Sequence, residues 1–272
     1  MGNTPFVVLI PARLASSRLP NKPLADLAGL PMVVRVAMQA RQSQAQQVVV
    51  AADDEAIVQA CKQHGIEALL TRTDHVSGSD RLAEAANLLG LSDDALVVNV
   101  QGDAPFTAPA HIVDIMRAAR ASGRAVTTPV VRLGWADLDR LRAAKLNTPA
   151  SGTTCVVGPD GRALWFSKAI LPMMRKEDAL RASEPLSPVL QHIGLYCYRP
   201  AALRRFEAAP ESAYEQLEGL EQLRLIALGI DIHAVVVAPA AITMSGVDSP
   251  ADVERAERLI AERGDPFIPW RD

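Results

Sequence analysis

The sequence predicts an α/β fold in which a mostly parallel sheet is flanked by helices. Short β-branched runs alternate with helix-like stretches through about residue 130. The run Ala95–Val100 is almost continuously apolar, as in strands that are buried on both faces of a parallel sheet. Strand–helix–strand crossovers are right-handed and place their strands in parallel, so this alternation predicts helices on both faces of one sheet.

The first half of the chain supplies the expected parallel strands and their helices. Phe6–Ile10 is the first strand, and an irregular segment follows it up to Pro31. Pro31 is expected at the first position of a helix that continues to Arg41. The other elements expected here are strands at 47–51, 67–70 and 95–100, a helix at 53–64 closed by Gly65, and a helix from about Asp80 to Leu89.

The second half of the chain has a different rhythm. Thr153–Val157 and Ala163–Phe166 flank Gly-Pro-Asp-Gly at 158–161, a pattern typical of a hairpin. The remaining expectations are strands at 192–198 and 235–237, a long helix at 213–228, a final helix at 249–262, and a loop over the polar run 175–187. Because neither a repeat nor a low-complexity linker interrupts the chain, residues 1–272 are expected to form a single domain.

The composition is that of an ordinary soluble globular protein, with 49% hydrophobic and 22% charged residues. The net charge of −3 gives no global basic field, so neither nucleic acid nor a membrane surface is an expected partner. The start of the chain lacks a signal-peptide pattern, and no apolar run approaches membrane-spanning length. The three scattered cysteines, Cys61, Cys155 and Cys197, favour a reducing, cytoplasmic location.

A basic loop, Pro11–Pro23, directly follows the first strand, at the carboxyl edge where open α/β sheets bind ligands. Arg13, Arg18 and Lys22 supply three cations within it. A triphosphate needs both charge neutralisation and directed hydrogen bonds, which Arg and Lys provide in different ways. The P-loop and dinucleotide-binding glycine patterns are both absent. The loop therefore predicts triphosphate binding, against the alternative of a solvated basic loop pinned by prolines.

Two carboxylates are candidates for the same edge of the sheet. Asp103 follows the strand at 95–100 through Gln101 and Gly102. Beside a triphosphate such an oxygen donor suits Mg²⁺, which commonly takes one or two carboxylates, phosphate oxygens and water. Asp248 is a second candidate, but an Asp before Ser-Pro is also an ordinary helix-start signal.

With these segments identified, the chain resembles the CMP-Kdo synthetases, which are 3-deoxy-manno-octulosonate (Kdo) cytidylyltransferases. The resemblance runs through nearly the whole length, with its motifs in matching order. They are Ile10-Pro-Ala-Arg-Leu-Ala-Ser-Ser-Arg-Leu-Pro-Asn-Lys-Pro-Leu24 and the segments at 50–54, 74–82, 99–103, 163–168, 192–196 and 220–224.

This resemblance implies a nucleotide-diphospho-sugar transferase-like (Rossmann-like) fold with a smaller mixed section for sugar binding and dimerisation. It implies a homodimer that joins CTP and Kdo into CMP-Kdo and diphosphate for lipopolysaccharide or capsule synthesis. Residues 1–130 would bind the nucleotide, 131–245 would bind the sugar and dimerise, and 246–272 would supply a metal-ligand turn and the last helix.

The resemblance also implies roles for individual residues. Catalysis would rest on Arg13, Lys22, Asp103 and Asp248, of which the two acids would hold Mg²⁺. The nucleotide, CTP, would contact Arg13, Arg18, Lys22, Asp53, Ser77, Gly78, Arg81 and Gln101. The acidic 2-keto sugar would contact Gln101, Lys168, His192, Tyr196, Glu221 and Gln222.

The chain departs from the family pattern mainly on the sugar side. Lys168 stands where the family usually has Arg, Gln191 replaces an Arg, and residues 148–157 lack the usual Lys. Ala104 replaces the Glu of the usual Gln-Gly-Asp-Glu-Pro turn. Lys does not replace a bidentate Arg neutrally on a carboxylate. Two alternatives therefore stay open: CTP-dependent activation of another ulosonic acid, such as 8-amino-Kdo or a nonulosonic acid, and a catalytically silent nucleotide-binding paralogue.

Overall fold

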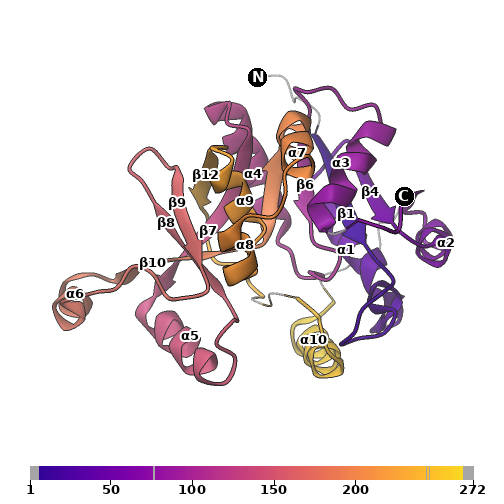
Figure 1. Ribbon diagram of the computed structural model, residues 1–272. Helices are drawn as coiled ribbons and strands as arrows, with labels where there is room; N and C mark the ends of the chain where they lie inside the picture. Colours follow the sequence, from indigo (N-terminus) through magenta and orange to yellow (C-terminus); the bar gives the residue numbers. More distant parts are fainter. Residues whose placement is uncertain (1–5, 76, 243, 245, 266–272) are drawn as a thin grey trace.

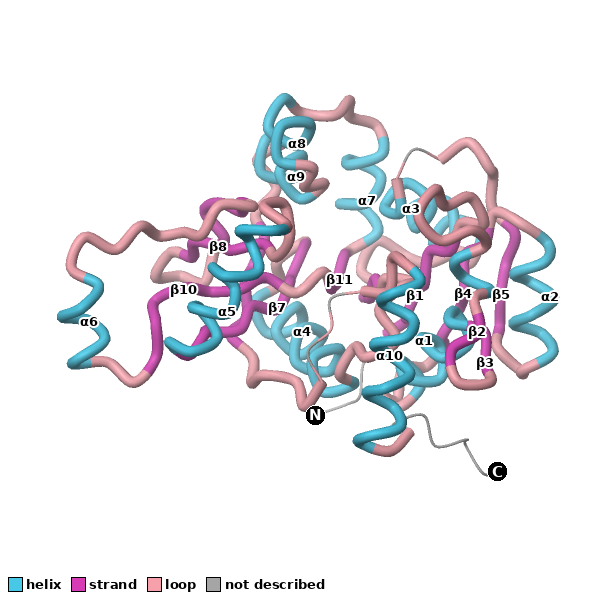
Figure 2. Tube along the Cα trace, turned by 90° about the horizontal axis from the view of Figure 1, so that it is seen from below, coloured by secondary structure: helices cyan, strands magenta, loops and turns pink. Residues whose placement is uncertain are grey.

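One large sheet runs through the part of the chain that the computed structural model describes, residues 6–75, 77–242, 244 and 246–265 (Figure 1). Its strands lie in the order β5-β4-β1-β6-β11-β7-β10-β8-β9, with β12 beside β7. Both views place α2 (Glu55–Gln63) at one end of the molecule and α6 (Glu177–Ser183) at the other, and Figure 2 shows β5 (Glu67–Leu70) beside α2. Within the described residues, no helix is both long and apolar enough to cross a membrane.

The first half of the chain forms the parallel part of the sheet, as predicted. Its strands are β1 (Phe6–Ala12), β4 (Gln47–Ala52), β5 (Glu67–Leu70) and β6 (Leu96–Val100). Its helices are α1 (Met32–Arg41), α2 (Glu55–Gln63), α3 (Gly78–Leu88) and α4 (Pro109–Ser122). Pro31 was wrongly predicted as a helical residue: it is the N-cap of α1, because it pairs with Asp26 in the small hairpin of β2 (Asp26–Leu27) and β3 (Leu30–Pro31).

The second half of the chain makes the sheet mixed. Its strands are β7 (Val126–Gly134), β8 (Thr153–Val157), β9 (Ala163–Ser167), β10 (Leu186–His192), β11 (Leu195–Tyr198) and β12 (Ile232–Val236). The predicted hairpin is confirmed as the antiparallel pair β8–β9. The antiparallel strand β11 lies between β6 and β7 and joins the two halves into one sheet.

Two apolar cores cover opposite faces of the sheet. Val7 and Leu9 point to the face covered by α3, α7 (Pro200–Glu207) and α9 (Gln222–Ala227). Val8 and Ile10 point to the opposite face, which is covered by α1, α2 and α4. Such alternation along a strand buried on both sides explains why β1 and, apart from Asn99, β6 are apolar. The carboxyl ends of these strands are then the natural place for polar side chains.

A third, smaller core returns the end of the chain to this edge. Helix α10 (Pro250–Arg263) contributes Ala256 and Ile260 to a cluster with Leu27 and Met32. Val247 is buried in the same cluster. The packing of α10 therefore places the residues just before it beside the turn that follows β6.

Two predicted elements are each divided in the structure. The strand expected at 192–198 is the end of β10 and the whole of β11, which are separate strands. The long helix expected at 213–228 is α8 (Ala213–Glu218) followed by α9. Gly219 ends α8 with a φ of +61°, a left-handed conformation that favours glycine at helix ends.

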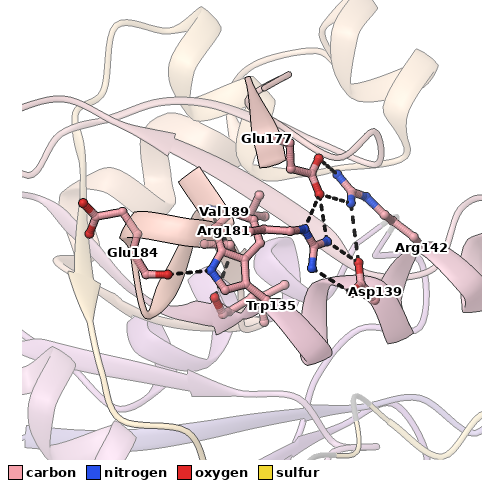
Figure 3. A network of polar contacts seen from close by, with 9 residues as sticks. Trp135, Asp139, Arg142, Glu177, Arg181, Glu184 and Val189 are labelled. Atoms are coloured by element: carbon pink, nitrogen blue, oxygen red, sulfur yellow. Dashed lines mark hydrogen bonds and ion pairs between the residues drawn. The ribbon is translucent and has the colours of Figure 1, made fainter. Parts of the chain in front are cut away.

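The polar run expected to be a loop contains α6 (Glu177–Ser183), which docks on α5 (Trp135–Asn147) through charged groups (Figure 3). The Arg181 guanidinium lies 4.7 Å from the Trp135 ring centroid. Glu177 accepts hydrogen bonds from Arg142 at 2.6 Å and Arg181 at 2.9 Å. None of the residues of α6 is buried. Apolar periodicity could not predict this helix, because polar contacts hold it.

Candidate active site

A polar cleft of about 220 Å³ opens at the carboxyl edge of β1 and β6, beside the start of α3. It gathers most of the residues predicted to bind the nucleotide, together with both a predicted metal ligand and a predicted sugar ligand. These residues are Arg13, Lys22, Ser77, Gly78, Arg81, Gln101, Asp103 and Glu221. A larger hollow of about 410 Å³ lies at the opposite end of β1, around Phe6 and Arg117, and contains no residue predicted for the site.

Gly102 allows the turn after β6 to approach the end of β1. A Cβ atom added there would lie 2.5 Å from the carbonyl oxygen of Pro11, so only glycine fits without a backbone shift. Gln101 and Asp103 flank this glycine. The close approach therefore brings both side chains to the wall of the cleft opposite the basic loop.

The two predicted metal ligands meet at Lys22. The Lys22 ammonium donates to Asp103 Oδ2 at 2.5 Å and to Asp248 Oδ1 at 2.9 Å. Arg18, whose side chain is 70% exposed, reaches the same Asp248 oxygen at 3.1 Å. Burial alone would lower the pKa of Lys22, but the charges and hydrogen bonds of Asp103 and Asp248 outweigh it and raise that pKa.

The helix-start explanation for Asp248 is not supported, because its neighbour Ser249 is the N-cap of α10. Ser249 Oγ accepts from the Asp252 amide, while the Asp248 carboxylate faces Lys22. The backbone amide of Val247 donates to the Asp103 carbonyl at 2.9 Å and fixes the two segments against each other.

The donor set fits Mg²⁺ bound together with a triphosphate. Both carboxylates reach one common cation, the Lys22 ammonium, so both can reach a metal ion placed between them. Mg²⁺ commonly takes only one or two protein carboxylates and fills its other positions with phosphate oxygens and water. Among the described residues, no group of three or more His, Cys, Asp or Glu is placed to hold a metal ion, so phosphate oxygens or water would have to complete the coordination offered by these two carboxylates.

Ser77 and Gly78 stand at the start of α3. Ser77 Oγ accepts from the Asp80 amide at 3.2 Å, and Asp80 accepts from the Ser77 amide at 3.0 Å, which forms a capping box. Gly78 packs against the ring of Pro11, where an added Cβ would lie 3.4 Å from Cγ. The cleft therefore borders a helix N-terminus whose first residues are fixed by their own side chains.

Arg81 and Asp53 support the cleft from behind. Arg81 is 3% exposed and donates to Thr71 Oγ1 at 2.5 Å and to the Arg72 carbonyl at 3.0 Å. Desolvation lowers the pKa of Arg81, and the Asp53 carboxylate, 3.5 Å away, opposes that shift. Asp53 Oδ1 also accepts from the Leu14 amide at 2.8 Å, which anchors the start of the basic loop. Direct contact of these two residues with a nucleotide stays a prediction.

The predicted sugar ligands are divided between the cleft and its surroundings: Gln101 and Glu221 line the cleft, while Lys168, His192 and Tyr196 are not among its lining residues. Glu221 lies open to the cleft and accepts from Ser79 Oγ at 2.9 Å. Desolvation raises the pKa of Glu221, and the hydrogen bond from Ser79 opposes this rise. The rings of His192 and Tyr196 lie 5.3 Å apart. Gln222, the first residue of α9, is buried and is not among the cleft-lining residues.

His192 is neutral in this setting. Thr128 Oγ1 donates to the Leu195 carbonyl at 2.7 Å, so it accepts from His192 Nε2 at 2.8 Å and fixes the Nε2–H tautomer. Desolvation lowers the pKa of His192 to about 3, and the charge of Lys168 adds to that effect. The Lys168 ammonium itself donates to Thr153 Oγ1 at 3.3 Å.

The hydroxyl of Tyr196 is buried and has no hydrogen-bond partner among the described residues. Desolvation raises its pKa well above the usual value, so the hydroxyl stays protonated. A buried donor without a partner costs stability unless a ligand or ordered water satisfies it. This hydroxyl is consistent with the predicted place of Tyr196 in a sugar pocket.

Three further residues of the site carried no recognised motif in the sequence. Asp80 completes the capping box, and the Ser77-x-x-Asp80 spacing could have indicated it. Glu218 and Lys145 contact the backbone around Lys168 and come from α8 and α5. No local pattern marks them, because their contacts join segments that are far apart in the sequence.

Comparisons with known proteins show the family to which the chain is similar. The family model described as cytidylyltransferase matches residues 7–232. A 3-deoxy-manno-octulosonate cytidylyltransferase of Acidovorax ebreus (strain TPSY) is 48% identical and covers 94% of this chain and 97% of the relative. The protein of the same name from Acidovorax sp. (strain JS42) has the same identity and coverage.

Solved structures confirm the fold. The structure of a CMP:2-keto-3-deoxy-manno-octonic acid synthetase complexed with CTP has a TM-score of 0.81 at 35% identity, over 96% of this chain and 100% of that one. A cytidylyltransferase from Leptospira borgpetersenii serovar Hardjo-bovis (strain JB197) shares the fold, with a TM-score of 0.59 at 13% identity over 95% and 88% of the two chains. The chain belongs to the cytidylyltransferase family and is similar throughout to members named 3-deoxy-manno-octulosonate cytidylyltransferase.

Proposed function

We propose that this protein activates Kdo: it joins CTP and Kdo and yields CMP-Kdo and diphosphate. The single observation that carries the proposal is the meeting of Lys22, Asp103 and Asp248 at one point of the cleft. Lys22 belongs to the predicted phosphate-binding loop, and the two carboxylates lie 81 and 226 residues away along the chain. The fold alone does not require these three charged groups to converge. The names of the relatives supply the substrates.

Different residues of the cleft bind different parts of the nucleotide. Arg13 and Lys22, with Arg18 at the rim, bind the triphosphate and stabilise the charge that grows on the departing diphosphate. Ser77 and Gly78 hold the base end of the nucleotide at the start of α3. The anomeric hydroxyl of the sugar attacks the α-phosphorus, the bond to the diphosphate breaks, and the hydroxyl proton passes to water. Such a transfer is mainly positioning and charge stabilisation.

On the sugar side, Lys168 binds the carboxylate of the acid, and His192, Tyr196 and Glu221 bind its hydroxyl groups. Gln101, between the two halves, orients both substrates. Mg²⁺ held by Asp103 and Asp248 would neutralise charge on the phosphates. The neutral imidazole of His192 and the protonated hydroxyl of Tyr196 suit hydrogen bonding to a polyhydroxylated ligand.

Two further features belong to the same proposal. The free cysteines Cys61, Cys155 and Cys197 suit a reducing cytoplasm. A homodimer formed by the second section of the chain would cover large apolar side chains that are exposed there. They are Leu146, Leu164, Met173, Leu186, Tyr214, Leu217 and Val236. We place the product in lipopolysaccharide or capsule synthesis, on the strength of the resemblance alone.

The test is diphosphate release by the purified protein with CTP, Mg²⁺ and Kdo, with 8-amino-Kdo and a nonulosonic acid in parallel. Release with Kdo supports the proposal. Release only with another acid overturns the choice of sugar and keeps the nucleotide chemistry. A folded protein that binds CTP and releases no diphosphate with any acid would instead be the nucleotide-binding paralogue.

The matched pair Asp103→Asn and Asp178→Asn tests the site itself. Asn has the shape of Asp without its charge, so Asp103→Asn should lower turnover by about a hundredfold or more at an unchanged circular dichroism spectrum. Asp178 lies exposed on α6, away from the cleft, and its variant should keep wild-type turnover. Near-normal turnover by Asp103→Asn would refute the metal-ligand role.

A further inference from the structure

Charged side chains from two distant elements hold both polar backbone groups of Lys168. Glu218 Oε2 accepts from the Lys168 amide at 2.8 Å, from a position 50 residues along the chain. Lys145 Nζ donates to the Lys168 carbonyl at 2.6 Å, from a position 23 residues back. Strand β9 ends at Ser167, so Lys168 lies just beyond the sheet and lacks strand partners of its own. These two contacts take the place of the backbone hydrogen bonds that a neighbouring strand would provide.

Glu218 has both carboxylate oxygens engaged with the protein. Its Oε1 accepts from Ser167 Oγ at 2.8 Å while Oε2 holds the next residue's amide. Ser167 is 4% exposed, so the first of these contacts is inside the molecule. A carboxylate that is occupied in this way, and that would repel an acid, is unsuited to bind an acidic sugar itself. Its position instead defines where the chain leaves β9.

Lys145 ties the neighbouring loop to the same point. Besides the Lys168 carbonyl, its ammonium donates to the carbonyls of Pro149 at 3.2 Å and Gly152 at 3.1 Å, and to that of Ser151. An ammonium has three donors, so these carbonyls share them around one centre. The loop 148–152 belongs to the stretch 148–157, in which the family's usual Lys is missing. Lys145 therefore contacts two places at which the chain departs from the family pattern. One is the loop 148–152, and the other is Lys168, which stands where the family usually has Arg.

Lys168 depends on such support because its side chain is flexible. Its ammonium lies 3.3 Å from Thr153 Oγ1. The charge of this ammonium helps to lower the pKa of His192. A guanidinium presents a rigid fork, whereas an ammonium is a point charge on a four-carbon stem whose direction follows the backbone below it. A fixed backbone at Lys168 compensates for the loss of the fork.

We propose that Glu218 and Lys145 are positioning residues that aim Lys168 at the carboxylate of the acidic sugar. This inference rests on the proposed function. It assigns to these two residues an effect on sugar binding and none on nucleotide binding, because neither of them lines the cleft that gathers the predicted nucleotide ligands.

The variants are Glu218→Ala, Glu218→Gln and Lys145→Met, with Glu211→Ala as the matched control. Glu211 lies exposed just before α8 and contacts Gln216. We expect Glu218→Ala and Lys145→Met to raise the KM for Kdo about tenfold or more, with kcat and the KM for CTP changed by less than about threefold. Glu218→Gln keeps an acceptor for the Lys168 amide and should recover part of the loss. Glu211→Ala should match wild type.

Amide hydrogen exchange at residues 167–169 provides a readout that needs no substrate. Faster exchange in Glu218→Ala than in wild type and Glu211→Ala, together with the selective rise in KM, supports the positioning role. Equal exchange overturns it, and so does an equal rise in the KM values for sugar and CTP, which would indicate general damage. A wild-type protein that releases no diphosphate with any acid overturns the proposed function separately.

Discussion

Lys22 Nζ lies 2.5 Å from Asp103 Oδ2, although 81 residues separate the two along the chain. The same ammonium donates to Asp248. In the protein alone, Lys22 is therefore the counter-ion of both carboxylates that the sequence assigns to a metal. A divalent cation between these carboxylates would have to replace the ammonium there, which then becomes free to contact the triphosphate.

Replacing Lys22 with Met should have two opposite effects. Use of CTP should weaken by about tenfold or more, because a phosphate-binding charge is lost. Binding of Mg²⁺ to the nucleotide-free protein should become stronger, because two neighbouring carboxylates lose their counter-ion. Steady-state kinetics measures the first effect and isothermal titration calorimetry the second. Lys62→Met, an exposed change on α2, serves as the control; unchanged metal affinity in Lys22→Met would contradict the counter-ion role.

Gly102→Ala should damage the cleft without changing any charged group. Its Cβ would lie 2.5 Å from the Pro11 carbonyl oxygen, so the β1 edge or the turn after β6 must move. Overpacking of this kind costs about 1–3 kcal/mol of unfolding free energy, and the shift of Gln101 and Asp103 should lower kcat/KM about tenfold. Urea unfolding and kinetics measure the two effects. Gly194→Ala has open space around its added Cβ and should leave stability near wild type; an equally small loss in Gly102→Ala would show that the edge adapts.

The edge of the sheet could be predicted from sequence because its signals are local. An apolar run ends, a turn begins, and Arg13 or Asp103 follows within a few residues. Parallel strands end at one edge, so the two loops had to be neighbours. The convergence of Asp248 was less certain, because the sequence alone did not show that Ser249 would cap the last helix.

The contacts that could not be predicted join distant segments through side chains. Lys145 and Glu218 meet at Lys168 from two helices, and neither belongs to a periodic pattern that points there. Gly219 could have indicated that the stretch 213–228 forms two helices, since a glycine after a short helical run commonly ends the helix. The continuous pattern of Leu and Glu around it favoured a single helix instead.

The pH dependence of stability should report the neutral imidazole of His192. Its pKa is lowered to about 3 in the folded protein, against about 6.5 in an unfolded chain, first by desolvation and then by Lys168. The unfolded state then binds the extra proton below about pH 6.5, so unfolding free energy is highest above that pH and falls as the pH is lowered toward 3. This group contributes a slope of at most about 1.4 kcal/mol per pH unit.

Urea unfolding at pH 7, 6 and 5 measures that slope in wild type and His192→Gln. Other acids contribute equally to both proteins, so the difference between the slopes isolates His192. The variant should lose less stability on acidification than wild type. His64→Gln, at the exposed end of α2, is the control. Parallel slopes in wild type and His192→Gln would mean that the imidazole titrates normally in the fold.

Arg181→Ala should release α6 from α5, because α6 has no buried side chain to hold it (Figure 3). The variant loses the cation–π contact with Trp135 and the ion pairs with Asp139 and Glu177. Hydrogen bonds from Arg142 and Arg181 lower the pKa of Glu177 to about 2, so acid should weaken the same network only as the pH falls from about 4 toward 2.

Limited proteolysis of Arg181→Ala between residues 171 and 186 should become several-fold faster, and high salt should speed cleavage of wild type by screening. Arg140→Ala removes a single ion pair with Asp137 on α5 and should leave the cleavage rate unchanged. Equal rates in Arg181→Ala and wild type would show that α6 stays in place without the contacts of Arg181.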